Sequence, residues 1–405
     1  MFKLNKNISW YLLLSVCLSF SIKASPWIGT DDVYLRSDLQ ILADAGLITV
    51  PVNTFPLPWR AISVQLKQTV SADLSNYVNL AYRHVMYKLN AAKNNYGNSK
   101  LEIEAAQESI PSSFGSNNDI EWGITSSSEY DAPLFSIRAT ANYAKYHDKD
   151  TLQYNFDDSY FAVTTGKTNF FIDTQSQWWS PSWLQSLSAE QRVHPSYELG
   201  LERTFINIPV LGDAYFKTGI NKLRSSDDWE YYWRSRLALK PFKSLELSIS
   251  HFDFKNAQYD VEDDAQELSV DGRLSLFPLI ELPLGFYAQY MIDDSESDYN
   301  DSLLGSDYSF VAKNTQIRVI FEYSDTDNDT DEYGHRYSIG SYVQMKNDHQ
   351  WQIFLHHHDT DILKNQLVGA YRFLVYKGML SLSLLLSDSD QSDKINTGIS
   401  WELRF

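Results

Sequence analysis

The sequence has a single cysteine, Cys17, among 405 residues, and it lies close to the N-terminus. A chain that loses this segment on export can form no disulfide. Long apolar runs are equally scarce, because no stretch after residue 24 approaches the roughly 18 apolar residues of a membrane-spanning helix. Basic residues are also few, with 34 Lys and Arg against 52 Asp and Glu and a formal charge of -18. This balance argues against nucleic-acid binding, which needs clustered cations to neutralise phosphates.

The N-terminal segment has the pattern of a secretory signal peptide. Basic residues precede an apolar run from Trp10 to Ile22, and the small residue Ala24 follows. The run is too short to span a bilayer, so residues 1–24 are predicted to be cleaved and to take no part in the fold. A lipoprotein signal ending at Cys17 is the alternative, but Val16 stands where such a signal carries a small residue.

The C-terminal stretch, Lys394 to Phe405, alternates apolar and polar residues with the period of a β-strand. It ends on an aromatic residue, which is typical of the strand that closes an outer-membrane β-barrel. A soluble strand with one buried face is the alternative. The aromatic content of 14% favours the barrel, because membrane barrels carry aromatic girdles at both interfaces.

The same period of two recurs from Leu101 onward and predicts that residues 96–405 form one transmembrane β-barrel of about 18 antiparallel strands. If the two short segments beside Gly166 do not form strands, the number falls to about 16. The predicted strands lie near residues 100–107, 120–130, 135–146, 159–165, 168–173, 197–205, 213–223, 229–239, 245–252, 264–276, 284–292, 307–313, 314–323, 335–345, 350–357, 366–375, 379–386 and 394–405.

Alternate connections differ in length, which predicts the orientation of the barrel. If the last strand ends in the periplasm, connections such as 131–134 and 376–378 are the short periplasmic turns. The connections between them, such as 324–334 and 387–393, are mostly longer and strongly acidic. These acidic loops are therefore predicted to lie outside the cell.

Residues 25–95 have the pattern of helices. Asp31 or Asp32 can cap a first helix, and Ser71 can cap a longer second helix whose apolar residues recur at helical spacing. A short helical piece is expected after Trp59. A unit of about 70 residues is too small to bury a large core alone. It is therefore predicted to pack on the barrel as a periplasmic α-helical plug or cap.

The strand face that points into the lumen collects arginines. They are Arg138, Arg234, Arg236, Arg273, Arg318 and Arg372. One interpretation is an ion-paired interior, shared with carboxylates, that holds the wall and the helical unit together. The other interpretation is a polar lining for a solute path or for an anionic saccharide.

The longest connection, Asp173 to Ser196, is rich in tryptophan. It carries Gln177, Trp178, Trp179, Trp183 and Arg192. Tryptophan rings stack on the C–H faces of sugars, and Gln and Arg side chains hydrogen-bond hydroxyls or carboxylates. These five residues are therefore candidate glycan-binding residues. The alternative is a loop that folds inward, with its tryptophans forming a small hydrophobic anchor.

Residues 356–358 are three histidines followed by acidic residues, a composition that resembles a metal site. Neighbouring residues on a strand point to opposite faces, so His357 cannot join His356 and His358 without a bend, and no specific metal site is predicted. The acidic outer loops could hold Ca²⁺ or Mg²⁺ loosely, because these ions prefer oxygen ligands. The sequence carries no catalytic motif that would support an enzymatic activity, and no other cofactor is predicted.

Two stretches resemble the capsule-assembly Wzi family. The first, from Arg36 to Trp59, reads RSDLQILADAGLITVPVNTFPLPW. The second begins with Trp178-Trp179-Ser180-Pro181 and continues through a Ser-Leu-Ser run to His194-Pro195. The rest of the barrel is similar to the family only in its alternating pattern.

The resemblance implies an outer-membrane barrel of about 18 strands with a periplasmic helical bundle, located in a Gram-negative bacterium. It also implies a lectin that helps to attach and organise capsular or other surface polysaccharide, with that polysaccharide, outer-membrane lipid and the export machinery as partners. A porin or sugar-selective channel is the alternative, and an outer-membrane enzyme is a third possibility. Acidic loops would repel an acidic capsule unless divalent cations bridge the two.

Overall fold

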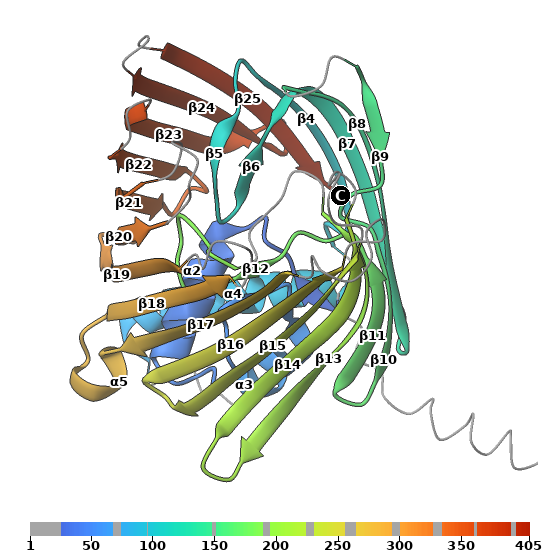
Figure 1. Ribbon diagram of the computed structural model, residues 1–405, viewed down its shortest axis with the longest axis vertical. Helices are drawn as coiled ribbons and strands as arrows, with labels where there is room; N and C mark the ends of the chain where they lie inside the picture. Colours follow the sequence, from blue (N-terminus) through green and yellow to red (C-terminus); the bar gives the residue numbers. More distant parts are fainter. Residues whose placement is uncertain are drawn as a thin grey trace, which may run out of the picture.

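The computed structural model describes residues 26–67, 74–94, 96–147, 151–188, 195–223, 231–255, 265–293, 300–326, 334–359, 363–389 and 394–405. The predicted signal peptide lies outside these residues. Figure 1 shows a ring of strands that surrounds helices and inward-folded loops.

Eighteen antiparallel strands close into one barrel, as predicted. The last strand pairs with the first through partners such as Trp401 and Ile103. The strands are β4 (Ser99–Ala106), β7 (Ile120–Asp131), β8 (Phe135–Tyr146), β10 (Tyr160–Thr165), β11 (Thr168–Asp173), β13 (Tyr197–Ile208), β14 (Gly212–Lys222), β15 (Tyr231–Phe242), β16 (Leu245–Lys255), β17 (Ala265–Ser275), β18 (Leu284–Asp293), β19 (Asn300–Ala312), β20 (Thr315–Asp325), β21 (Arg336–Gln344), β22 (Gln350–His358), β23 (Leu363–Val375), β24 (Gly378–Ser389) and β25 (Lys394–Arg404).

The two faces of the strands differ in polarity as the alternating sequence predicts. On β16, Leu247 and Ile249 are exposed on the outer face, whereas Ser248 and Ser250 are buried on the lumen face. An apolar outer face beside a polar inner face is the pattern of a barrel that meets lipid outside.

The connections separate into two ends of the barrel. Tight turns such as 243–244, 313–314 and 376–377 lie at what we call the short-turn end. The opposite end, which we call the long-loop end, carries longer connections such as 107–119 and 174–196. The predicted alternation of short and long connections is confirmed. β19 is longer than predicted, because it begins at Asn300 and its outer connection is correspondingly shorter.

Further short strands are not among the eighteen of the closed ring, although β9 extends the barrel sheet beside β8, and the sequence pattern did not predict them. In the 107–119 connection, β5 (Ile110–Ser113) and β6 (Ser116–Asn118) form a hairpin. β9 (Gln153–Asn155) pairs with β8. In the N-terminal region, β1 (Trp27–Ile28) pairs with β3 (Leu57–Pro58), and β2 (Thr54–Phe55) pairs with β12 (Trp178–Trp179) in the tryptophan-rich loop.

Three helices form in the N-terminal region: α2 (Val33–Asp44), α3 (Trp59–Leu66) and α4 (Asn76–Lys93). Asp32 caps α2, since its side chain accepts a hydrogen bond from the Leu35 N–H at 2.9 Å. The predicted Ser71 cap is wrong, because α4 begins after Ser75. The buried residues of α4 lie on one face of the helix, and α4 packs against α2. In the described part of the chain, no helix is long and apolar enough to cross a membrane.

Helix α2 lies inside the lumen, and every one of its residues is buried. Side chains of the barrel wall bind it directly. Arg318 Nε donates to Ser37 Oγ at 2.9 Å, and Lys240 Nζ donates to the Ala43 carbonyl at 3.0 Å. A helix end with such partners has its orphan carbonyls satisfied. α2 therefore acts as a plug that is fastened to strands β15 and β20.

Candidate functional site

The tryptophan-rich loop enters the lumen from the long-loop end and meets the plug. Trp178 and Trp179 form β12, which pairs with Phe55 and Thr54 of β2. Trp178, Trp179 and Trp183 are each 0% exposed. Burial of three such rings contributes several kcal/mol and fixes the loop in place.

Arg36 of α2 is the point at which plug and loops meet. Its guanidinium carbon lies 4.2 Å from the Trp183 ring centre and 4.3 Å from that of Phe114 in the β5–β6 hairpin. Its Nη2 donates to the carbonyls of Ser180 and Ser182 at 3.2 and 2.7 Å. Burial lowers the pKa of Arg36 to about 9. Stacking a cation between rings holds three separate segments of the chain together.

The predicted glycan-binding residues of this loop expose no ring face to solution in this structure. Gln177 is also buried, and its Oε1 accepts a hydrogen bond from Lys217 Nζ at 2.8 Å. Arg192 lies outside the described residues. Glycan binding by these side chains stays a prediction that requires the loop to open. The alternative interpretation, an inward-folded hydrophobic anchor, matches the observed geometry.

The predicted lumen arginines point inward, and five of them pair with carboxylates. Arg236 Nη1 donates to Asp271 at 2.6 Å, Arg273 binds Asp44 and Asp307, and Arg318 also binds Asp307. Arg234 binds Glu198, and Arg138 binds Glu129 and Asp158. Arg372 lines a cavity on another part of the wall. Arg236, Arg273 and Arg318 therefore join the wall to the N-terminal region, whereas Arg234 forms a buried ion pair within the wall.

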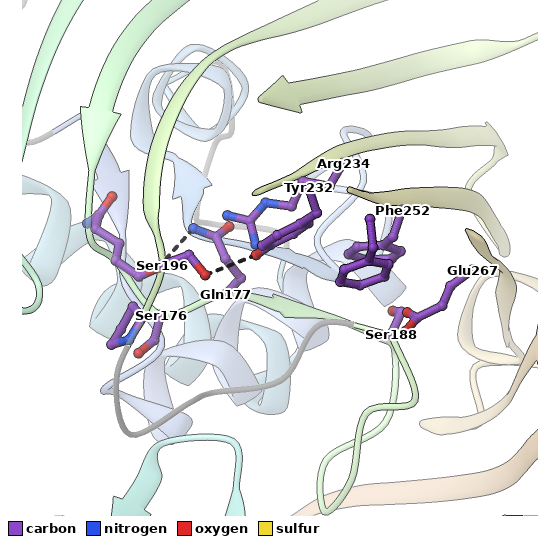
Figure 2. A pocket seen from close by; sticks show the side chains of 11 residues that line it. Ser176, Gln177, Ser188, Ser196, Tyr232, Arg234, Phe252 and Glu267 are labelled. Atoms are coloured by element: carbon purple, nitrogen blue, oxygen red, sulfur yellow. Dashed lines mark hydrogen bonds between the residues drawn. The ribbon is translucent and has the colours of Figure 1, made fainter. Parts of the chain in front are cut away.

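A pocket of about 30 Å³ lies beside the inward loop, at the long-loop end of β15, β16 and β17 (Figure 2). Its lining consists of Gln175, Ser176, Gln177, Ser188, Pro195, Ser196, Tyr232, Arg234, Phe252, Phe254 and Glu267. The loop supplies the amide and hydroxyl groups, and the barrel strands supply the rings. Such a mixture of a flat apolar wall and converging polar groups is typical of small-ligand sites.

Three aromatic rings form one wall of this pocket. The ring centres of Tyr232 and Phe254 lie 5.1 Å apart with planes inclined by 23°. Those of Phe252 and Phe254 lie 6.5 Å apart with planes inclined by 15°. On the loop side, Ser196 Oγ and the Tyr232 hydroxyl lie 3.2 Å apart, as Figure 2 shows. Tyr232 and Phe252 are buried, whereas Phe254 is partly exposed, so Phe254 is the ring of this wall on which a sugar could stack.

Several buried polar atoms around the pocket have no hydrogen-bond partner among the residues that the structure describes. They are Gln175 Oε1, Trp179 Nε1 and Asn221 Oδ1. Trp179 packs on Phe252, and Asn221 is the strand partner of Tyr232. A buried polar group without a partner costs about 1–3 kcal/mol. These atoms therefore favour water or a hydroxyl-rich ligand in this region.

The lumen face of β16 carries a sequence signal for this pocket, which the composition of the tryptophan-rich loop does not reveal. Phe252 and Phe254 share the lumen face of β16 with Ser248 and Ser250. Aromatic side chains on a lumen face whose other residues are small and polar indicate a surface that contacts a ligand or another segment. The outer face of a barrel, by contrast, carries aromatic residues in every member of the class.

The histidine run forms no metal centre with the residues described. His356 is buried on the lumen face, and its Nδ1 lies 2.8 Å from Ser338 Oγ. His357 points to the other face, where its Nδ1 lies 3.0 Å from Asn365 Oδ1. Within the described ranges no group of three or more His, Cys, Asp or Glu side chains could hold a metal ion. Most of the acidic 324–334 loop lies outside those ranges.

Comparisons with known proteins agree with this architecture. A family model described as "Capsule assembly protein Wzi" matches residues 92–254. The solved structure of Wzi from Escherichia coli has a TM-score of 0.82 at 16% sequence identity, and the match covers 94% of this chain and 100% of that chain. The chain therefore has the barrel fold of that protein, and the segment 92–254 is similar to the Wzi family. That E. coli protein is described as an outer-membrane protein involved in group 1 capsule assembly and as a carbohydrate-binding β-barrel.

Two further proteins are similar to this chain. A Klebsiella pneumoniae protein described as an uncharacterized 55.8 kDa protein in the cps region is 22% identical over 310 residues. The match covers 66% of this chain but 58% of that relative, so the chain spans less than two thirds of the relative's length. Pseudomonas aeruginosa OccK3 (OpdO) shares the barrel fold at a TM-score of 0.50 and 7% identity, over 76% of this chain and 94% of that chain.

A closed antiparallel barrel with an apolar outer face is the form of an outer-membrane protein, and this protein is located in the outer membrane of a Gram-negative bacterium. Barrels of this class have short periplasmic turns and longer extracellular loops. The long-loop end, with the aromatic pocket, therefore faces the cell exterior. Helix α4 lies at the periplasmic end, because its Tyr77 packs against Phe277 in the turn between β17 and β18.

Proposed function

We propose that this protein binds surface polysaccharide at the extracellular end of its barrel and helps to attach or organise it on the cell. The observation that carries the proposal is the pocket of Tyr232, Phe252 and Phe254 at the long-loop end of a barrel that is similar to the Wzi family. The description of E. coli Wzi as a carbohydrate-binding barrel involved in capsule assembly supports it. No catalytic step is part of the proposal.

The pocket has room for about two waters in this structure, so binding of a sugar unit requires the inward loop to move, and its lining then suits a unit of low charge. The Phe254 ring can stack on the C–H face of a sugar, while Gln175 and Ser176 can bond hydroxyls. The charge of Arg234 is already engaged by Glu198, which leaves little attraction for an anionic group. The acidic outer loops would also repel a polyanion, so an acidic glycan would need bridging Ca²⁺ or Mg²⁺. If an acidic glycan still binds after a chelator has removed Ca²⁺ and Mg²⁺, bridging by these cations is ruled out.

The runner-up, a porin or sugar-selective channel, is less well supported. The plug α2 and the tryptophan-rich loop meet inside the lumen and bury Trp178 and Trp183 completely. A wide pore through this region would require both α2 and the tryptophan-rich loop to move out of the lumen. The polar lumen of an open porin has no such packed core.

Deleting the gene and measuring cell-attached against shed polysaccharide tests the proposal in the cell. We expect the attached fraction to fall and the shed fraction to rise. Reintroducing the wild-type gene should restore attachment. An unchanged distribution would rule out the assembly and attachment role.

Glycan binding by the purified protein tests the pocket. Phe254→Ala should weaken binding about fivefold, because it removes an aromatic contact worth about 1 kcal/mol. Phe321→Ala is the matched control, since that phenylalanine is exposed on the outer face of β20. Both variants should retain the heat-resistant electrophoretic migration of a folded barrel. Equal affinity of the two variants would count against the pocket.

A contact with the polysaccharide export machinery is also proposed, at the periplasmic end. Tyr87 of α4 is exposed there, on a helix that packs on α2. A photo-crosslinking residue at position 87 should capture an export component in cells, whereas one at the lipid-facing Phe321 should not. Identical crosslinking from both positions would contradict a specific contact.

A further inference from the structure

Two adjoining cavities follow one side of the lumen, away from the aromatic pocket. The middle cavity, of about 220 Å³, is bounded by β22 to β25, β4 and the β5–β6 hairpin. The periplasmic cavity, of about 530 Å³, lies between α4, β1, α2 and strands β4, β7 and β8. Asp31 and Lys100 line both cavities, so the two spaces meet at these side chains. Each has room for several waters, which need about 15 Å³ apiece.

We call the wall formed by β22 to β25 and β4 the open side, because its ionic side chains stay accessible. Asp31 and Arg404 are 51% and 42% exposed, and Lys100 is 19% exposed. We call the wall formed by β15 to β20 the packed side. There the side chains of Arg236 and Asp271 are 0% and 2% exposed, because the plug covers them. The plug therefore fills the lumen unevenly.

Counting Arg404 at the junction, the middle cavity has four acidic against three basic residues, a formal excess of one negative charge. Its acidic residues are Asp31, Glu102, Glu104 and Glu402, and its basic residues are Lys100 and Arg372. Serines 381, 383 and 400 complete much of the wall with hydroxyl groups. A narrow, low-dielectric passage concentrates the field of its charges and raises the local concentration of counter-ions. The chemistry of this space suits small hydrated cations.

Ion pairs cross the boundary between the two cavities. Arg404 Nη2 donates to Asp31 Oδ2 at 2.7 Å and thereby joins the last strand to the start of the plug. Arg404 Nε also donates to Glu402 Oε1 at 2.7 Å, and Lys100 Nζ donates to Glu102 Oε2 at 3.1 Å. These side chains narrow the space at the junction, and half-exposed pairs of this kind exchange readily with water.

A third, smaller cavity of about 20 Å³ continues along the same strands toward the long-loop end. It shares Glu104, Ser381, Ser383 and Ser400 with the middle cavity and reaches Ala106, Ile120 and Gly398. Its volume holds little more than one water. It is the smallest of the three spaces in volume.

We propose that a narrow water-filled path for small cations runs along the open side of the lumen, past the plug, with the Asp31–Arg404 ion pair as its periplasmic constriction. The path is separate from the aromatic pocket and does not depend on glycan binding. It is too narrow for a sugar, so it differs from the wide channel of a porin. The plug would then block polymer and solute while water and small cations still cross.

Planar-bilayer recording of the purified full-length protein in a KCl gradient tests this path. We expect a small conductance in which potassium is about fivefold more permeant than chloride. Glu102→Gln combined with Glu104→Gln should bring that ratio toward unity. Asp31→Ala combined with Arg404→Ala leaves the net charge unchanged and should raise the conductance by removing the constriction.

A blocking variant with a matched control locates the path. Ser383→Trp places a large ring in the middle cavity and should abolish the conductance. Leu382→Trp, on the same strand but exposed on the lipid face, should leave it unchanged. Heat-resistant migration and glycan binding check the fold of each variant. The proposal is overturned if Ser383→Trp conducts as wild type does, or if wild type and the constriction variant conduct no more than lipid alone.

Discussion

The packed side and the open side of the lumen carry the same charged residue types, but these residues have different roles on the two sides. On the packed side, Arg273 and Arg318 share Asp307, and all three side chains are almost fully buried under α2. On the open side, Arg404 and Asp31 form an ion pair of 2.7 Å that stays about half exposed. The difference shows that the position of the plug, rather than the residue type, decides whether a lumen charge is structural.

Burial changes what breaking an ion pair costs. A buried pair that loses one partner leaves an uncompensated charge, which costs about 3–5 kcal/mol. An exposed pair contributes about 0–1 kcal/mol, because water replaces the lost partner. Variants on the two sides of the lumen should therefore differ strongly in stability, and the comparison can be tested from its largest effect to its smallest.

The largest effect is expected where the packed side meets the tryptophan-rich loop. Trp178→Ala combined with Trp179→Ala should lower the free energy of unfolding by about 3–5 kcal/mol per residue, because each ring leaves a cavity. Urea titration of the purified protein, followed by heat-resistant migration, measures this. Weaker glycan binding with unchanged stability would instead show that these residues bind glycan directly.

Asp307→Ala tests the ion-paired network of the packed side alone. It deprives Arg318 and Arg273 of their shared carboxylate and should lower the free energy of unfolding by about 3–5 kcal/mol. The same urea titration measures the change. A loss below about 1 kcal/mol would mean that water reaches this network and that the two sides do not differ.

The contact between α4 and α2 is intermediate in burial and should depend on pH. His84 pairs with Asp38, and their side chains are 24% and 1% exposed. Burial alone would lower the pKa of His84, but the charge and hydrogen bond of Asp38 outweigh it and raise that pKa above 6.5. The stabilisation is therefore complete below pH 6.5 and is lost as the pH rises through the raised value.

Protease sensitivity of α4, measured across this pH range, tests the contact. Wild-type α4 should become more susceptible as the pH rises above neutrality, while the barrel stays resistant. Asp32, which pairs with Lys88 beside this contact, has a lowered pKa, so its carboxylate stays charged and should not contribute to the change. His84→Gln should remove the pH dependence. A wild-type profile that is flat with pH would contradict the assignment.

The smallest effect on stability is expected on the open side. Arg404→Gln should change the free energy of unfolding by about 0.5 kcal/mol, because the Arg404 side chain is 42% exposed. Its urea midpoint should therefore overlap that of wild type. A loss as large as that of Asp307→Ala would show that the open side is as tightly packed as the other.

The barrel could be predicted from the sequence because its signals are local. Each strand carries its own alternation, and Trp401 and Leu403 of the last strand show the period without any partner. Helix ends are less certain, since Ser71 and Ser75 both precede the same apolar run and only packing against α2 selects Ser75. Propensity is a weak guide where tertiary contacts decide.

The site could be predicted only in part, because its contacts join segments far apart in the sequence. A loop with Trp178 and Trp183 has the same composition whether it binds glycan outside or packs inside. Its burial follows from Arg36, which lies more than a hundred residues earlier in the chain. The pocket of Tyr232 and Phe254 likewise forms only once β15 and β16 are in register. Local periodicity does not contain that information.

The Arg36 junction has a consequence for how the plug is held in the molecule. The plug precedes every barrel strand in the chain. Its Arg36 nevertheless contacts Phe114 and Trp183, which lie in two different outer connections later in the sequence. The sheet closes only when the last strand pairs with the first. Removing the plug from the lumen would therefore require its contacts with both outer connections to break together.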